Sequence, residues 1–240
     1  IPIFFLKGLI FSTIIYVLPE QEYGLFSFLI ALSYGIARLL DFGTSEGIIA
    51  RNIEEEHLNN LFKITGIKII ITIFVPAVLV TIDLIFKIGI PTVYLFLGCY
   101  LIIFIREYLV SVFLSIAEKN IGDINIRPNY MISNCALQIV GFVIIYFFIG
   151  HLSIEQFVAI NLISSIIALI YFFGNEIPKC FSFKISLENF LNLFKSNFRQ
   201  HKTQIKISWV SVLNKLLEVN ILFFLAGVEQ FALFSVYTSL

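Results

Sequence analysis

The sequence predicts an all-α polytopic membrane protein, and two features of its composition lead to that class. Of its 240 residues, 59% are hydrophobic and only 13% are charged, whereas about a quarter of the residues of a soluble domain are charged. Phenylalanine contributes 27 residues against a single tryptophan, and such side chains suit helix surfaces that face lipid, where a polar group would lack a partner. The charge deficit excludes a soluble globular fold.

The charge balance and the cysteines exclude several functions. The formal net charge is zero, so the chain has no basic footprint for nucleic acid. Cys99, Cys135 and Cys180 lie far apart and form no CxxC pair, so we interpret them as small hydrophobic residues. The acidic run Glu54–Glu56 before His57 is interpreted as a solvated face rather than a metal site. No metal and no cofactor is predicted.

The hydrophobic stretches predict the membrane topology, because a helix that crosses a bilayer needs about 20 mostly apolar residues. Seven stretches and the start of an eighth meet this need, at roughly 1–18, 25–48, 65–87, 91–115, 129–150, 153–174, 207–227 and 231–240. We expect a six-helix transmembrane bundle at 1–174, a cytoplasmic connector at 175–206 and the start of a second bundle at 207–240. Both chain ends lie inside apolar runs, so an N-terminal fragment of a longer protein is expected.

Lysine and arginine gather on one side of this predicted topology. The loops after the second, fourth and sixth spans, with the adjoining helix ends, carry most of the chain's 16 basic residues, and the other loops carry only Lys87. The basic residues of the first set are Arg51, Lys63, Lys68, Lys119, Arg127, Lys179, Lys184, Lys195, Arg199, Lys202 and Lys206. Positively charged loops stay cytoplasmic, which predicts a cytoplasmic N-terminus.

The connector shows the spacing of an amphipathic helix. Its apolar residues recur at intervals of three and four, at Leu187, Phe190, Leu191, Phe194 and Phe198. Basic residues lie beside this face, so we expect the helix to rest on the cytoplasmic membrane surface, near anionic lipids.

A weak internal repeat relates the start of the sequence to its end at an offset of 208 residues. Glu22–Ser27 aligns with Gln230–Ser235, and extension backwards without a gap aligns Lys7 with Lys215. Lysines inside membrane spans are rare, so this coincidence has more weight than matched leucines. Six spans separate the copies and give them the same orientation, which is the parallel repeat found in many secondary transporters.

The segments Glu20–Ser27 and Leu40–Gly43 resemble sequences of the Wzx-type polysaccharide and O-antigen flippases. These belong to the MATE-like multidrug/oligosaccharidyl-lipid/polysaccharide exporter superfamily. In that family a Tyr-Gly-Leu-(Phe/Tyr)-Ser turn opens the second helix, and Asp-x-Gly closes it before a basic residue, here Arg51. The segment Gly227–Ser235 is similar to the same turn, with Ala232 in place of glycine.

This resemblance implies two six-helix bundles that rock around a central cavity in the bacterial inner membrane. The cargo would be an undecaprenyl-pyrophosphate-linked oligosaccharide, which is moved outward for the synthesis of lipopolysaccharide O-antigen or another surface polysaccharide. Such a protein needs no covalent chemistry, and we expect no enzyme activity. The sequence contains no GxSxG motif, no P-loop and no zinc-ligand spacing.

Basic residues inside the spans are the candidates for binding the cargo, because a pyrophosphate in hydrocarbon needs cations in place of its water. The predicted anion-binding set is Lys7, Lys215, Arg38 and Arg106. Charges inside a membrane often mark a transport pathway. The alternatives are local pairing, of Arg38 with Asp41 or of Lys215 with Glu218, and snorkelling of the arginines towards the cytoplasm.

Acidic residues could couple transport to an H⁺ or Na⁺ gradient, and Glu218 and Asp41 are the candidates, although Asp41 also suits a solvated helix end. A drug exporter of the same superfamily remains an alternative, but its cationic cargo would favour carboxylates over the four bases. A membrane glycosyltransferase or polymerase would need a sizeable external loop, and the predicted external loops are short. A purely structural subunit would not explain the aligned lysines.

Overall fold

The computed structural model describes residues 18–40, 62, 65–66, 68–70, 72–74, 80–81, 91–120, 125–150, 152–181 and 187–239. Every secondary-structure element within these residues is helical, and none of these residues lies in a strand, as the sequence predicts. The elements are α2 (Glu20–Leu40), α5 (Pro91–Ile103), the π-helix η1 (Phe104–Leu109), α6 (Val110–Asn120), α7 (Ile126–Ile149), α8 (Ile154–Phe173), the 3₁₀-helix η2 (Ile177–Phe181), α9 (Leu187–Ala226) and α10 (Val228–Ser239).

Four helical segments of the described chain are long and apolar enough to cross a membrane, which is consistent with a membrane protein. They are Val93–Glu118, Ile126–Ile149, Ile154–Phe173 and Trp209–Ala226, and each overlaps a predicted span. The predicted spans 1–18 and 65–87 lie almost wholly or largely outside the described residues. The number of helices in the first bundle therefore stays a prediction.

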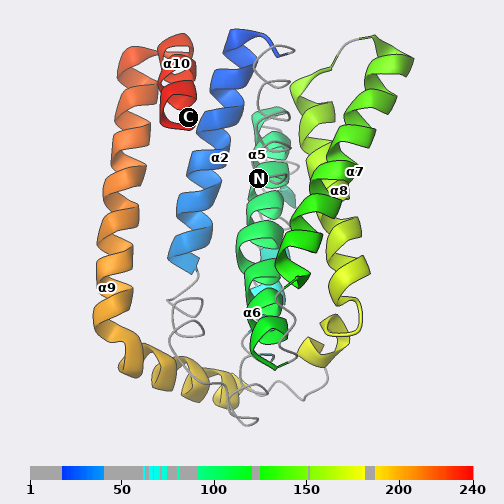
Figure 1. The fold of residues 1–240 in the computed structure, drawn as a ribbon. Coiled ribbons are helices and arrows are strands. Elements are labelled where there is room, and N and C mark those ends of the chain that lie inside the picture. The colour runs from blue at the N-terminus through cyan, green and yellow to red at the C-terminus, as the bar shows by residue number, and fades with distance from the viewer. Residues whose placement is uncertain are drawn as a thin grey trace.

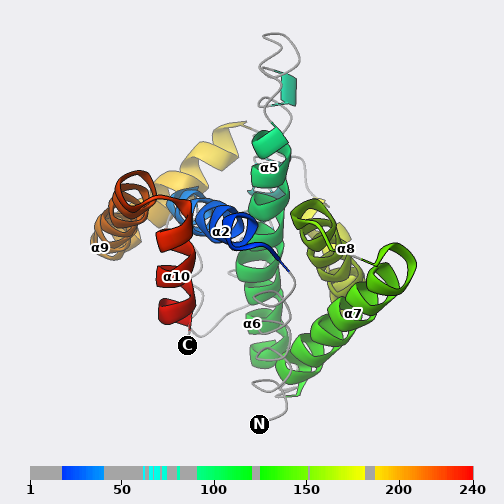
Figure 2. The same ribbon diagram turned by 90° about the horizontal axis from the view of Figure 1, so that it is seen from above.

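The long helices run side by side between two common ends of the molecule (Figure 1). We call the end at which α2 and α10 begin the upper end, and the opposite one the lower end. In both ribbon views α2 stands between α9 and the α5–α6 helix, while α7 and α8 lie on the far side of α5–α6 (Figures 1 and 2).

Helix α9 joins two segments that the sequence separates. It covers Leu187–Ala226 without a break, whereas the predicted boundary between connector and span falls at 206. Its first part lies across the lower end of the molecule and its second part rises beside α2 (Figure 1). The prediction that the connector is helical is thus confirmed, and the chain passes from one segment to the other by turning within a helix.

Helices α2 and α10 begin a little earlier than predicted and in the same way. They start at Glu20 and Val228, rather than near 25 and 231, and these two starts are 208 residues apart. The Tyr23 N–H donates to the Pro19 carbonyl at 2.9 Å, and the Phe231 N–H donates to the Gly227 carbonyl at 3.0 Å. Acidic residues in both first turns favour these starts, because they complement the helix dipole.

The predicted span 91–115 is one continuous helix, but it is not α-helical throughout. The six residues Phe104–Leu109 form the π-helix η1 between α5 and α6. π-Helical turns are rare in proteins, and those that occur often lie at functional sites. This one contains Arg106, one of the predicted anion-binding residues.

Helices α7 and α8 form a hairpin whose turn the sequence predicts at 150–153. Gly150 ends α7 with φ 78°, a left-handed conformation that glycine adopts without strain. Ser153 begins α8 with a capping box: its hydroxyl accepts from the Gln156 N–H, and its own N–H donates to the Gln156 side chain. Phe142 and Phe157 stack below the turn, with ring centroids 5.1 Å apart.

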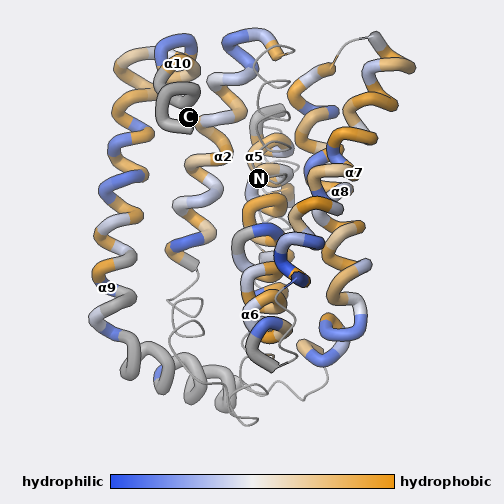
Figure 3. The backbone as a smooth tube through the Cα atoms, in the orientation of Figure 1, coloured by the Kyte–Doolittle hydropathy of each residue, from blue (hydrophilic) through white to orange (hydrophobic). Residues whose placement is uncertain are grey.

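The outer face of this hairpin is apolar and exposed. Phe147 and Phe148 of α7 are 84% and 85% exposed, and Tyr171 of α8 is 80% exposed. Hydrophobic residues dominate the upper part of α7 and hydrophilic ones gather near η2 (Figure 3). Exposed aromatic and aliphatic side chains at this density suit a surface that contacts lipid rather than water.

Helix α2 packs closely against α9 and α10 through two glycines. A Cβ atom at Gly24 would collide with the Val228 carbonyl of α10, and one at Gly35 would collide with the Leu216 side chain of α9. Without a hydrophobic effect between helices in lipid, small residues allow this close van der Waals contact. The α2 helix therefore depends on glycine along the side that faces the end of the chain.

We predict that Gly35→Val destabilises the protein, because the added side chain must displace Leu216. Overpacking of this kind costs about 1–3 kcal/mol. The measurement is the thermal unfolding midpoint of the detergent-solubilised protein, which should fall relative to wild type. Ala136→Val is the matched control, since Ala136 is exposed on α7. Equal midpoints for the two variants would contradict the close contact of α2 with α9.

Candidate functional site

The structure describes four of the six residues that the sequence singles out. Arg38 lies half-buried in the last turn of α2, and Arg106 lies half-buried in η1. Lys215 and Glu218 are exposed on α9. The remaining two, Lys7 and Asp41, lie outside the described residues.

Contacts between helices place Lys215 in depth relative to α2. Gly35 faces Leu216, and Phe28 stacks on Phe223. Because α2 and α9 run in opposite directions, residues of the two helices lie level where their numbers add to 251. By this register Lys215 lies level with Ile36. Arg38 is half a helical turn below that level, since each residue advances the helix by about 1.5 Å.

Two further registers place Arg106 at nearly the same depth. Gly98 faces Val158, and Phe113 stacks on Phe173. A residue of α5–α6 therefore lies level with the residue of α8 whose number is 60 higher. Phe26 packs edge-on against Phe157, which relates α8 to α2. Arg106 is therefore level with about Gly35. We call Arg38, Arg106 and Lys215 the cationic band, because they lie within about one turn of each other in depth on three adjacent helices.

The structure does not show the local ion pair of Lys215 with Glu218 that the sequence left open as an alternative. Neither Lys215 nor Arg106 forms a hydrogen bond or an ion pair with any residue in the described part of the chain. Glu218 follows Lys215 by one turn, but the two side chains are not paired. The described contacts do not bring the three cations together into a single pocket. They do leave Lys215 and Arg106 available to an anion.

Sequence reasoning missed a row of buried polar side chains in α7 and α8. On α7 it consists of Tyr130, Asn134 and Gln138, spaced four residues apart, and the Gln138 amide donates to Asn134 Oδ1 at 3.3 Å. On α8, Asn161 and Ser165 are buried and donate to backbone carbonyls of their own helix. The four-residue spacing of polar residues inside an apolar span was the available signal.

Buried polar groups within a span serve either to hold helices together or to line a route for a polar cargo. By the register of α8 on α5–α6, Ser165 is level with Ile105, next to Arg106. Ser165 therefore places a buried polar side chain of the α7–α8 hairpin at the depth of the cationic band.

Charged residues separate between the two ends of the molecule. The described terminal turns at the upper end contain the acidic residues Glu20, Glu22, Glu155 and Glu229, and they contain no lysine or arginine. At the lower end, the exposed basic residues are Arg127, Lys179, Lys195, Lys202 and Lys206. The bases at the lower end are those of the predicted cytoplasmic loops.

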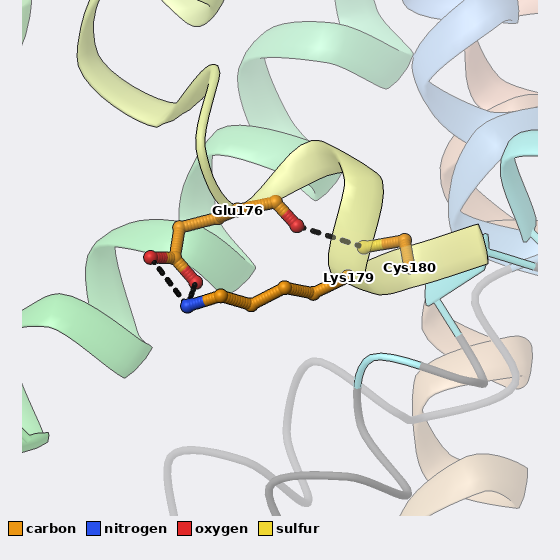
Figure 4. A network of polar contacts seen from close by, with 3 residues as sticks. All are labelled: Glu176, Lys179 and Cys180. Carbon is orange, nitrogen blue, oxygen red and sulfur yellow. Dashed lines mark hydrogen bonds and ion pairs between the residues drawn. The ribbon is translucent and has the colours of Figure 1, made fainter. Parts of the chain in front are cut away.

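Two of these bases are paired, and the other three have no partner among the described residues. The Arg127 guanidinium donates to both carboxylate oxygens of Glu118, at 2.7 and 3.0 Å. This ion pair connects α7 to α6. Lys179 contacts both oxygens of Glu176, at 2.9 and 2.8 Å (Figure 4). Among the described residues, the unpaired positive charge of the lower end therefore comes from the first part of α9.

The segment around η2 buries a thiol beside an acid. Cys180 is fully buried and its thiol donates to the Glu176 carbonyl at 3.9 Å (Figure 4). Burial raises the pKa of the Cys180 thiol to about 11, and the negative charge of Glu176 adds to this shift. The Cys180 carbonyl also lies against Gly66, where a Cβ atom would collide with it. These contacts indicate a packing role for Cys180, as the sequence predicts.

Comparison with known proteins adds no relative. A scan against protein-family models finds no match, and searches of curated proteins and of solved structures find no significant match.

We predict that Cys180 resists thiol reagents, because only about a thousandth of a thiol with a pKa of about 11 is ionised at pH 8. In a Cys99→Ala, Cys135→Ala variant, maleimide should label Cys180 slowly in native membranes and rapidly after denaturation. The folded state holds this proton more tightly than the unfolded state, so Cys180 lowers stability as pH rises from about 8.5 towards 11. Rapid native labelling at pH 7.5 would contradict the buried position.

Proposed function

We propose that this chain belongs to a flippase that moves an undecaprenyl-pyrophosphate-linked oligosaccharide across the bacterial inner membrane by alternating access. The observation that carries the proposal is the correspondence between α2 and α10. Both helices begin at the same end of the molecule, 208 residues apart, with matching hydrogen bonds at their first turns. A parallel repeat whose copies meet face to face is the construction of many two-bundle transporters.

The contact between the two helix starts supports the repeat further. The amide of Gln21 donates to the Glu229 carboxylate at 3.2 Å, and these residues occupy equivalent positions at the offset of 208. Equivalent residues approach each other in this way close to a two-fold axis. Tyr23 and Phe231, another equivalent pair, are both buried. The axis would run along the membrane normal, between the two bundles.

The cationic band supports an anionic cargo. Lys215 and Arg106 are without a counter-ion among the described residues, and they lie at one depth within predicted spans. An unpaired cation in a membrane is costly unless water or an anion accompanies it during function. A pyrophosphate passing between the bundles would supply that anion, with Lys acting as a point charge and Arg as a two-pronged donor.

The charges at the two ends support an orientation in the membrane. The basic lower end is assigned to the cytoplasm and the acidic upper end to the outside, in accordance with the positive-inside rule. If residues 1–18 cross the membrane, as the sequence predicts, the N-terminus is cytoplasmic. Glu218, exposed near Lys215, and Asp41 remain the candidates for coupling to H⁺ or Na⁺.

A drug exporter of the same superfamily is the alternative. It requires carboxylates that face a cationic cargo, and Glu218 is the one acidic residue of the predicted set that the structure describes. The three basic residues of the cationic band favour an anion. A glycosyltransferase or polymerase is less well supported, because it would need a sizeable external loop, whereas α7 ends at Ile149 and α8 already begins at Ile154.

The test is complementation of the native host's own deletion, with the complete gene and surface polysaccharide as the readout. Wild type should restore the polymer, and Lys215→Ala and Arg106→Ala should restore it at least about tenfold less well at equal membrane abundance. A hydrogen bond to a charged group contributes about 1.5–3 kcal/mol, which corresponds to about ten- to a hundredfold in rate or affinity.

Lys206→Ala is the matched control, because Lys206 is an exposed lysine of the same helix that lies below the cationic band. It should restore the polymer as well as wild type does. If the deletion never accumulates undecaprenyl-linked units and wild type restores nothing, the cargo is wrong. If Lys206→Ala fails as severely as Lys215→Ala, the band has no special role.

A further inference from the structure

The first part of α9 lies across the lower end of the molecule, and the second part contains the candidate span Trp209–Ala226 (Figure 1). Both parts belong to one unbroken helix, Leu187–Ala226. A helix that continues directly from a span and turns across its end lies at the membrane surface, because no loop separates the two parts. The position of the first part is therefore set by the span.

Three exposed lysines share one face of α9 where it approaches this span. Lys195, Lys202 and Lys206 are seven and four residues apart, and at 3.6 residues per turn they fall within about 40° of one another around the helix. Together they extend over about 16 Å along the helix. We call these three residues the lysine line.

The lysine line has no counter-ion in the part of the chain that the structure describes. None of its side chains forms an ion pair or a hydrogen bond with another described residue. The sequence gives a reason, because residues 189–208 contain four Lys or Arg residues and no Asp or Glu. By contrast, Arg127 and Lys179 at the same end are each paired with a glutamate.

An anionic membrane surface matches this stretch in both charge and position. Basic segments directly beside a transmembrane helix are attracted to the anionic phospholipids of the cytoplasmic leaflet. The same stretch repeats apolar residues at helical spacing from Leu187 to Phe198, which is the pattern of a helix that lies in the membrane interface. A nucleic acid or a soluble acidic protein would complement the charge alone, and it would not account for apolar residues beside the lysines.

We infer that the lysine line binds the headgroups of anionic phospholipids and so holds the first part of α9 against the leaflet. This inference goes beyond the proposed function and does not depend on the cargo, since it requires only that Trp209–Ala226 cross the membrane. Because α9 is continuous, the same lipids set the level of Lys215 in the bilayer. The binding is spread over three charges, so a single loss such as Lys206→Ala leaves two in place.

A natural reporter lies beside this surface. Trp209 is the only tryptophan of the 240 residues, and it follows Lys206 by three residues, which is about 5 Å along α9. The purified protein is placed in bilayers of phosphatidylcholine and phosphatidylglycerol, with bromine on the acyl chains of one lipid or the other, and quenching of Trp209 fluorescence is measured. Phosphatidylglycerol should be enriched beside Trp209 at least about fivefold, which is the contribution of one lysine near an anionic surface.

Lys202→Gln with Lys206→Gln removes the two charges nearest to Trp209 and should lower this enrichment several-fold. The matched control is Arg127→Gln with Lys179→Gln, which removes two paired bases from the same end and should leave the enrichment unchanged. Equal loss with both double variants would overturn the inference, because net charge rather than the lysine line would then matter. Equal quenching of wild type by the two lipids would also overturn it, and would leave the line to an acidic partner in the cytoplasm.

A salt titration of the wild-type protein needs no substitution and so does not depend on the folding of a variant. At about 1 M NaCl the Debye length falls to about 3 Å, and the enrichment of phosphatidylglycerol should disappear. An enrichment that persists at this salt concentration contradicts the inference, because it would then come from the acyl chains and not from the charges of the lysine line.

Discussion

The described structure depends on how closely α2 can approach the last two helices. Inside a bilayer, helices gain nothing by hiding apolar surface from one another, so association depends on close packing. Gly24 and Gly35 provide it, because neither position leaves room for a Cβ atom beside Val228 or Leu216. The contact fixes the register of α2 on α9, and that register in turn sets Lys215 close to the depth of Arg38. The close packing of α2 on α9 therefore also determines the relative depth of their basic residues.

The charged residues are distributed unevenly along the axis of the molecule. The cations of α2 and α9 lie towards the lower end, where bases dominate, and the terminal turns above them are acidic. In the proposed flippase, this distribution would attract an anionic cargo to the cationic band. The π-helical turn at Phe104–Leu109 is a local departure from α-helix, and it contains Arg106.

The sequence predicted those features that depend on hydropathy and short-range signals. The spans at 129–150 and 153–174, the Gly150–Ser153 turn and the helix in the connector follow from apolar length, glycine and capping residues. It could not predict η1, because Phe104–Leu109 contains no residue that specifies a π-turn. Hydropathy alone places the starts of α2 and α10 too late, because Glu20 and Glu229 are polar and yet stabilise a first turn. The depth of the cations needed the inter-helix register, which only packing determines.

The central proposal is that the chain crosses the membrane with the acidic upper end outward and the basic lower end inward. The most direct measurement is the side from which an impermeant maleimide reaches single cysteines at Glu155→Cys and Lys195→Cys, both exposed and at opposite ends. The account predicts labelling of Glu155→Cys in intact spheroplasts and of Lys195→Cys only after permeabilisation. The reverse pattern would invert the orientation, and labelling of both in intact spheroplasts would contradict a closed, multi-pass membrane protein of this topology.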